Sequence, residues 1–110
     1  MNLPIQWFWV IAAIDGRMGL DRLIAYLMGL GRDPRDAAGY VFCNRAGNRL
    51  RVLVVDATGV WLCQRRLHRG SFVRAKSLDG VLNLTPDQMR WLCMGVDWQR
   101  LSASAAPMLV

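Results

Sequence analysis

Three strand-like segments separated by four-residue turns occupy the middle of this chain, and they constrain its fold more than any other feature. The segments 40–44, 49–55 and 60–68 each contain apolar residues, many of them β-branched or aromatic, and 49–55 begins with polar–apolar alternation. The turns at 45–48 (RAGN) and 56–59 (DATG) carry residues typical of tight reversals. Because connections this short join only antiparallel neighbours, the sequence predicts a meander.

Further elements are predicted on both sides of the meander. Residues 6–12 form a buried strand on the same grounds, and residues 71–75 form a short fourth strand of the meander. An amphipathic helix over about 17–30 is indicated by apolar residues at helical spacing. Gly31 is expected to end this helix.

A second helix has the best-defined start in the chain. Thr85 is the predicted N-cap, Pro86 is the first helical residue, and Gln88 is placed to close a capping box. Gly95 is expected to end the helix.

Length and composition limit how these elements combine. With 110 residues, 54% of them hydrophobic, the chain has material for one core. We predict a single α+β domain over 1–100, with a mostly antiparallel sheet of four or five strands and two principal helices. Residues 101–110 are expected to be a flexible tail. The longest apolar run, 7–14, is too short to span a bilayer, so we expect a cytoplasmic protein with no membrane contact.

The cysteines and the histidine argue against a metal centre. Cys43, Cys63 and Cys93 are odd in number and widely spaced, which favours reduced, buried thiols over a disulfide framework. His68 is the only histidine and there is no Cys-x-x-Cys, so we expect no structural metal and no cofactor.

The net charge of the chain lies in one segment, 45–76. This segment carries eight basic residues against the single acid Asp56, a net charge of +7, whereas 1–44 is neutral and 77–110 is −1. Such a block attracts polyanions, and nucleic acid is the commonest of these for a small intracellular protein. The predicted nucleic-acid-binding residues are Arg45, Arg49, Arg51, Arg65, Arg66, Arg69, Arg74 and Lys76.

Strand periodicity places some of these residues relative to one another. Arg49 and Arg51 are two apart and should share one face of the sheet, whereas Arg65 and Arg66 are adjacent and should lie on opposite faces or flank a bulge. A solvated sheet face is the alternative reading of the arginines. Anion binding is favoured because the acids that would neutralise such a face are missing.

Two aromatic residues lie among these charges. Trp61 and Phe72 could stack on bases if they were exposed. The core is the favoured position for both, since large aromatic residues are usually buried.

The sequence offers no convincing catalytic centre. Asp15, Asp21, Asp56 and Asp97 are the candidates for a metal-dependent nuclease, but several occupy cap or turn positions that aspartate fills routinely. No spacing brings them together, and His68 lacks a positioned nucleophile. We therefore predict no catalytic residues, no metal ligands and no small-molecule substrate.

Four blocks of sequence carry a family resemblance. They are DGRMGLDRL at 15–23, DP at 33–34, the long run 39–72, and LCMGVDW at 92–98, and the most specific part is D-x-T-G-V-W-L-x-x-x-R-L-x-x-G-x-F. Together they resemble the small accessory protein, known as TnpB or the second open reading frame protein, of insertion sequence family 66. The resemblance covers about residues 7–98.

The resemblance implies a protein of a bacterial mobile element that acts beside a separate transposase. Our leading hypothesis is a non-catalytic accessory protein of transposition that binds DNA, including the element's ends. The alternative is an adaptor that docks on the transposase, either by its basic face or by pairing a sheet edge with a partner strand. An unrecognised metal-dependent nuclease is the third reading.

Overall fold

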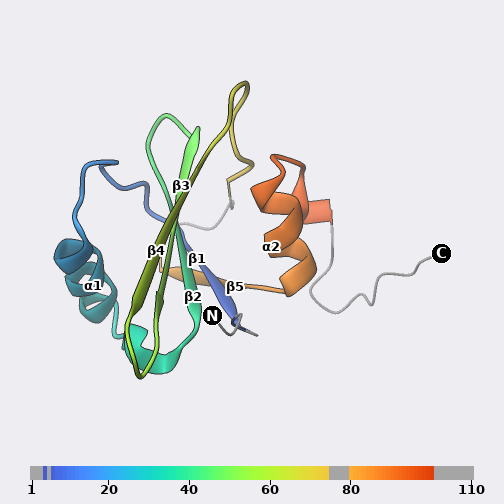
Figure 1. Cartoon of the computed structure of the whole chain (residues 1–110). Coiled ribbons are helices and arrows are strands. Elements are labelled where there is room, and N and C mark those ends of the chain that lie inside the picture. Colours follow the sequence, from blue (N-terminus) through green and yellow to red (C-terminus); the bar gives the residue numbers. More distant parts are fainter. Residues whose placement is uncertain (1–3, 5, 75–79, 101–110) are drawn as a thin grey trace.

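The computed structural model describes residues 4, 6–74 and 80–100, and a five-stranded sheet lies at its centre (Figure 1). The strand order across the sheet is β4-β3-β2-β1-β5. The strands are β1 (Trp7–Val10), β2 (Gly39–Cys43), β3 (Arg49–Val55), β4 (Val60–Arg66) and β5 (Val81–Leu84). The α+β class and the single domain predicted from the sequence are confirmed.

The predicted meander is present as β2, β3 and β4, which pair antiparallel in sequence order. The register between β3 and β4 is unbroken from the pair Val55–Val60 to the pair Arg49–Arg66. β5 pairs antiparallel with β1, whereas β1 pairs parallel with β2. The sheet is therefore mixed, with one parallel pair among antiparallel ones.

Helix α1 (Leu20–Gly29) covers one face of the sheet. Its Leu23 and Leu27 are fully buried in a cluster with Tyr40 and Leu53. The helix begins at residue 20 and not at 17, because residues 16–17 form a turn in which the Asp15 carboxylate accepts the Arg17 amide. The helix ends just before Gly31, as predicted.

The end of α1 depends on one residue with a left-handed backbone. Gly31 has φ of +79°, a conformation that glycine adopts without steric cost. The guanidinium of the next residue, Arg32, lies 4.2 Å from the centre of the Phe8 ring. This cation–π contact ties the end of α1 to β1.

Helix α2 (Pro86–Cys93) lies on the opposite face (Figure 1). The predicted capping box is confirmed: Thr85 Oγ1 accepts the Gln88 amide at 3.1 Å, and Gln88 Oε1 accepts the Thr85 amide at 2.9 Å. Leu92 packs in a second core cluster with Trp9 and Leu50. Each face of the sheet thus has its own core and its own helix.

Two expectations about the strands were wrong. Residues 71–74 are not a strand, because Phe72 is buried in the second core and its amide donates to Gly47 O, outside any ladder. The strand β5 was not expected. Two 3₁₀ helices, Pro34–Asp36 and Trp98–Arg100, complete the elements. Residue 75 and the expected tail, 101–110, lie outside the described residues.

The parallel pairing of β1 with β2 places Trp7 directly beside Gly39. A Cβ atom on Gly39 would overlap the Trp7 indole. Gly39→Ala should therefore lower the free energy of unfolding by about 1–3 kcal/mol through overpacking, as measured by urea denaturation. Gly59→Ala is the matched control, since a Cβ there meets no atom within 4 Å.

A double variant tests the cause of that loss. Trp7→Ala removes the ring that the new methyl group would meet, so adding Gly39→Ala to Trp7→Ala should cost little more than Trp7→Ala alone. Equal costs of Gly39→Ala in both backgrounds would contradict this explanation.

Candidate nucleic-acid interface

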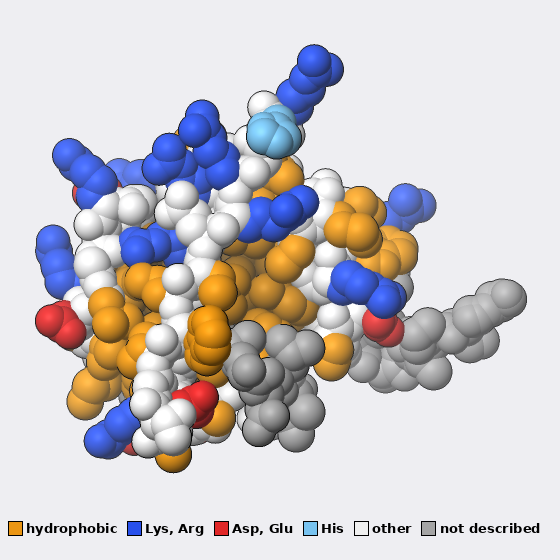
Figure 2. All heavy atoms as spheres, viewed as in Figure 1, with side chains coloured by type: hydrophobic (Ala, Val, Ile, Leu, Met, Phe, Trp, Pro, Cys, Tyr) orange, Lys and Arg blue, Asp and Glu red, His pale blue; other side chains and the backbone are white. Residues whose placement is uncertain are grey.

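Arginine side chains gather at one end of the sheet, where β3 begins, β4 ends and the β2–β3 turn lies. Arg45 is exposed on that turn, and Arg69 is exposed in the loop after β4. Arg49 and Arg66 are direct cross-strand partners. We call Arg45, Arg49, Arg66 and Arg69 the basic end. Figure 2 shows Lys and Arg side chains gathered over the upper part of the molecule, where the tips of β3 and β4 lie in Figure 1.

No ion pair neutralises the basic end within the part of the chain that the structure describes. The ion pairs in the described part of the chain are Arg17–Asp15, Arg35–Asp33 and Arg90–Asp87, and all three lie outside the basic segment. The basic end also makes no side-chain hydrogen bond to another described residue. Among the described residues, nothing pairs with its four guanidinium groups.

The one acid of the basic segment lies at the far end of the β3–β4 hairpin. Asp56 Oδ1 accepts the amides of Thr58 and Gly59 and the Thr58 hydroxyl at 2.9–3.0 Å. Hydrogen bonds from the Thr58 amide and hydroxyl hold the pKa of the Asp56 carboxyl below its usual value. Its charge is used to close the turn and does not screen the arginines.

The ladder brings Arg49 and Arg66 especially close. The Leu67 amide donates to Asn48 O at 3.0 Å, so the pair Asn48–Leu67 is hydrogen-bonded across the strands. Pairs alternate in an antiparallel ladder, which makes Arg49–Arg66 a non-hydrogen-bonded pair with Cα atoms about 4.5 Å apart. Like charges directly opposite each other destabilise a sheet unless an anion lies between them.

Three of the predicted arginines hold the protein's own backbone. Arg51 donates to Met18 O, and Arg65 donates through Nε to Cys93 O. Arg74 Nη2 donates to Asn44 O at 2.5 Å and to Arg45 O at 2.6 Å. Lys76 lies outside the described residues. The predicted set of eight therefore contains four free arginines and three with structural contacts.

The β2–β3 turn is also held by Asn44, which the sequence argument did not single out. Asn44 Oδ1 accepts the amides of Asn48 and Arg49, both at 3.1 Å, and Nδ2 donates to Asn48 Oδ1 at 2.8 Å. An asparagine that opens a turn is the local signal for this role. The bonds fix the turn that carries Arg45 and the start of the strand at Arg49.

The registers place the remaining predicted residues. Arg49 and Arg51 share one face, and Arg65 and Arg66 lie on opposite faces, as expected from the alternation. Phe72 is buried with 3% of its surface exposed, as predicted. The core position predicted for Trp61 is wrong: 46% of Trp61 is exposed, because neither helix covers the first half of β4 and α2 contacts the strand only near its end, where Arg65 donates to Cys93 O.

Three of the four candidate acids, Asp15, Asp56 and Asp97, serve local turns, and Asp21 lies in the first turn of α1. Asp15 accepts the Arg17 amide and Asp97 accepts the Gln99 amide. Among the residues described, no three His, Cys, Asp or Glu side chains form a group that could hold a metal ion. The structure gives the nuclease reading no support.

The cysteines are free thiols in different environments. Cys43 is buried and Cys93 is half-buried, and burial raises the pKa of both thiols. The expectation that all three are buried is wrong for Cys63, which is exposed on β4 for the same reason as Trp61.

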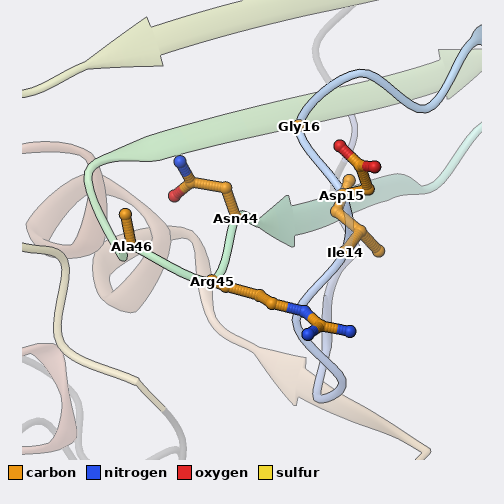
Figure 3. A pocket seen from close by; sticks show the side chains of 6 residues that line it. All are labelled: Ile14, Asp15, Gly16, Asn44, Arg45 and Ala46. Carbon is orange, nitrogen blue, oxygen red and sulfur yellow. The ribbon is translucent and has the colours of Figure 1, made fainter.

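A shallow pocket of about 450 Å³ adjoins the basic end. Figure 3 shows the Arg45 guanidinium and the Asp15 carboxylate pointing away from each other on its two sides. Hydrogen bonding from the Arg17 amide lowers the pKa of Asp15, and because Arg45 lines the same pocket, its lining carries one charge of each sign. The pocket is lined by Ile14, Asp15, Gly16, Asn44, Arg45 and Ala46.

The fold and the basic end define a small α+β domain with a cluster of arginines at one end of its sheet. The family model described as IS66 Orf2 like protein matches residues 5–103, and this chain belongs to that family. The family is that of an accessory protein of transposition, so the resemblance found in the motifs is confirmed. No helix in the described ranges is long and apolar enough to cross a membrane.

Two proteins of Sinorhizobium fredii (strain NBRC 101917 / NGR234) are similar to this chain. The chain is 36% identical over 67 residues to the protein named uncharacterized protein y4hO, a match that covers 61% of this chain and 58% of that protein. It is 32% identical over 89 residues to uncharacterized protein y4jC, covering 80% of this chain and 76% of that protein. No solved structure matches the chain.

The two carbonyl contacts of Arg74 predict a structural role. Arg74→Ala should lower the free energy of unfolding by about 1–3 kcal/mol, since hydrogen bonds from a charged donor would be lost from two carbonyls. Urea denaturation measures the loss. Arg69→Ala is the control and should stay within about 0.5 kcal/mol, since Arg69 is exposed and contacts no described acid.

The facing pair Arg49–Arg66 predicts the opposite sign. Arg66→Gln should raise the free energy of unfolding at low salt by about 0.2–1 kcal/mol, because a like-charge pair is removed. The gain should shrink at high salt as charges are screened. In a double-mutant cycle, Arg49→Gln and Arg66→Gln together should gain less than the sum of the single gains. A loss of stability in either single variant would contradict the interpretation.

Proposed function

We propose that this protein is a non-catalytic accessory protein of insertion-sequence transposition that binds DNA phosphates through the basic end. The observation that carries the proposal is the pair Arg49–Arg66. These two residues lie opposite each other on β3 and β4, and no acid among the described residues pairs with either of them. A phosphate between two such guanidinium groups would turn repulsion into charge-assisted hydrogen bonds. The DNA of the mobile element, met in the cytoplasm, is the proposed ligand.

The arrangement of the basic end supports contact with a backbone rather than with one anion. Arg45 and Arg69 lie on two different loops, on either side of the strand ends that carry Arg49 and Arg66. The four side chains therefore come from a turn, two strand ends and a loop, and they spread along one end of the sheet. A row of cations on a protruding surface suits successive phosphates of a duplex.

The other proposed partner is the transposase of the same element. A basic surface can also dock on an acidic protein surface, and charge alone does not separate the two ligands. Counterion release does separate them, since it gives DNA affinity a steep dependence on salt.

DNA binding should show a slope of log affinity against log salt of about −3 to −4, if the four arginines neutralise four phosphates. Fluorescence anisotropy with labelled duplexes from the element's terminal repeat and a scrambled sequence measures this. The double variant Arg49→Gln/Arg66→Gln should reduce the steepness of the slope by about 2. Arg35→Gln is the matched control, because Arg35 is paired with Asp33 outside the basic end.

The outcomes separate the ligands. Preference for the terminal repeat at moderate salt would indicate recognition of the element's ends. Equal, steep binding to both duplexes would indicate a general grip on phosphates. A DNA affinity that does not change with salt concentration, or an unchanged slope in the double variant, would contradict the proposal. Either result would favour a protein as the partner of the basic end.

A further inference from the structure

Strand β4 is a long edge strand without a partner on its outer side in the described part of the chain. It is the first strand in the sheet order, and all seven of its residues are exposed. The opposite edge, β5, has four residues, and Leu84 at its end is buried. Figure 1 shows β4 between the two helices, with neither α1 nor α2 over it.

The outer edge of β4 offers regularly spaced backbone groups. The Asp56 amide donates to Gly59 O at 2.9 Å, which makes that pair hydrogen-bonded and sets the alternation along the hairpin. The amides and carbonyls of Trp61, Cys63 and Arg65 therefore point toward β3. Those that point outward belong to Val60, Leu62, Gln64 and Arg66.

The first half of β4 lacks the usual protection of an edge. Val60, Trp61 and Leu62 are 43%, 46% and 36% exposed. They include no charge and no proline, and the unbroken register with β3 excludes a bulge. Exposed apolar edges of this kind pair with further strands. Figure 2 shows hydrophobic side chains at the surface below the Lys and Arg side chains that gather in the upper part of the view.

We propose that β4 pairs antiparallel with β4 of a second copy of this chain, about a two-fold axis at Cys63. Cys63 is the middle residue of the strand, so all seven residues find partners in this register. Trp61 then lies opposite Arg65 of the second copy, and Val60 lies opposite its Arg66. The proposal goes beyond DNA binding and does not depend on it.

The charges of β4 favour this occupant and this direction. In a parallel pair, Arg65 and Arg66 would lie beside their own copies, which like-charge repulsion opposes. In the antiparallel pair they lie at opposite ends, each against an apolar residue. The Arg65 guanidinium, whose Nε donates to Cys93 O of its own copy, presents its flat face to the Trp61 ring of the second copy as a cation–π contact, and the aliphatic stem of Arg66 covers Val60.

The hydrogen-bonding parity agrees with the axis at Cys63. The pairs Val60–Arg66 and Leu62–Gln64 join residues whose backbone groups point outward in both copies, so each pair can exchange two hydrogen bonds. Cys63 faces itself as a non-hydrogen-bonded pair, with Cα atoms about 4.5 Å apart. That separation is within the range a disulfide can bridge.

Sedimentation velocity over a concentration series tests the proposal on the full chain. The wild type should form a species of twice the monomer mass. Cys63→Lys places two lysines against each other on the axis and should return the protein to the monomer. Trp61→Glu is the discriminating variant, because it places a carboxylate opposite Arg65 of the second copy. The dimer should persist, and its dimerisation affinity should fall more steeply with rising salt than that of the wild type.

A crosslink checks the register. In a Cys93→Ala background, mild oxidation with diamide should join two chains through Cys63 at low protein concentration, and Cys63→Ala should abolish the product. Circular dichroism of each variant shows that it is folded.

Each result decides the proposal. A dimer lost in Cys63→Lys and kept in Trp61→Glu supports the two-fold pairing. A monomer at all concentrations overturns it. A dimer that Trp61→Glu abolishes overturns it as well, since that result indicates unspecific apolar association. DNA binding that survives in a monomeric variant would leave the proposed function intact.

Discussion

The parallel pairing of β1 with β2 is the constraint on which the rest of this structure depends. Two parallel neighbours cannot be joined by a tight turn, so the chain must leave the sheet after Val10 and return at Gly39. The crossover carries α1, which therefore covers one face of the sheet. The other face is left for α2, and β1 between β2 and β5 holds the two cores apart. The close approach of Trp7 to Gly39 shows how tightly this pair is packed.

Local signals in the sequence were enough for the elements whose partners are near in the chain. Short turns determine the meander, and the capping box at Thr85 marks the start of α2 within one turn. The partners of β1 depend on contacts between residues far apart, and no periodicity reports them. The same reason explains the error at 71–74: a short stretch with two apolar residues can also be a coil that inserts one aromatic residue, Phe72, into the core.

The candidate site likewise has features that the sequence predicts and features that depend on contacts between distant residues. Charge counting finds every arginine of the basic segment, and strand alternation assigns their faces. It cannot tell that Arg51, Arg65 and Arg74 donate to carbonyls of distant segments, because those carbonyls come close only in the folded chain. Nor can it tell that Trp61 is exposed, since that depends on how far two short helices extend across the sheet. Three-dimensional structure thus reduces the list of free cations and adds an exposed aromatic residue.

The uneven composition of β4 explains how one uncovered strand could serve an assembly without causing aggregation. An open apolar edge can pair with the edges of further copies, and parallel in-register stacking of such strands leads to fibrils. Arg65 and Arg66 oppose that stacking because every added copy would place like charges side by side. An antiparallel pair about Cys63 avoids the repulsion and uses the same edge of both copies, so the assembly closes at two. The edges that remain belong to β5, which is short and partly buried. Under this arrangement the two basic ends lie at opposite ends of the paired strands and stay open to phosphates.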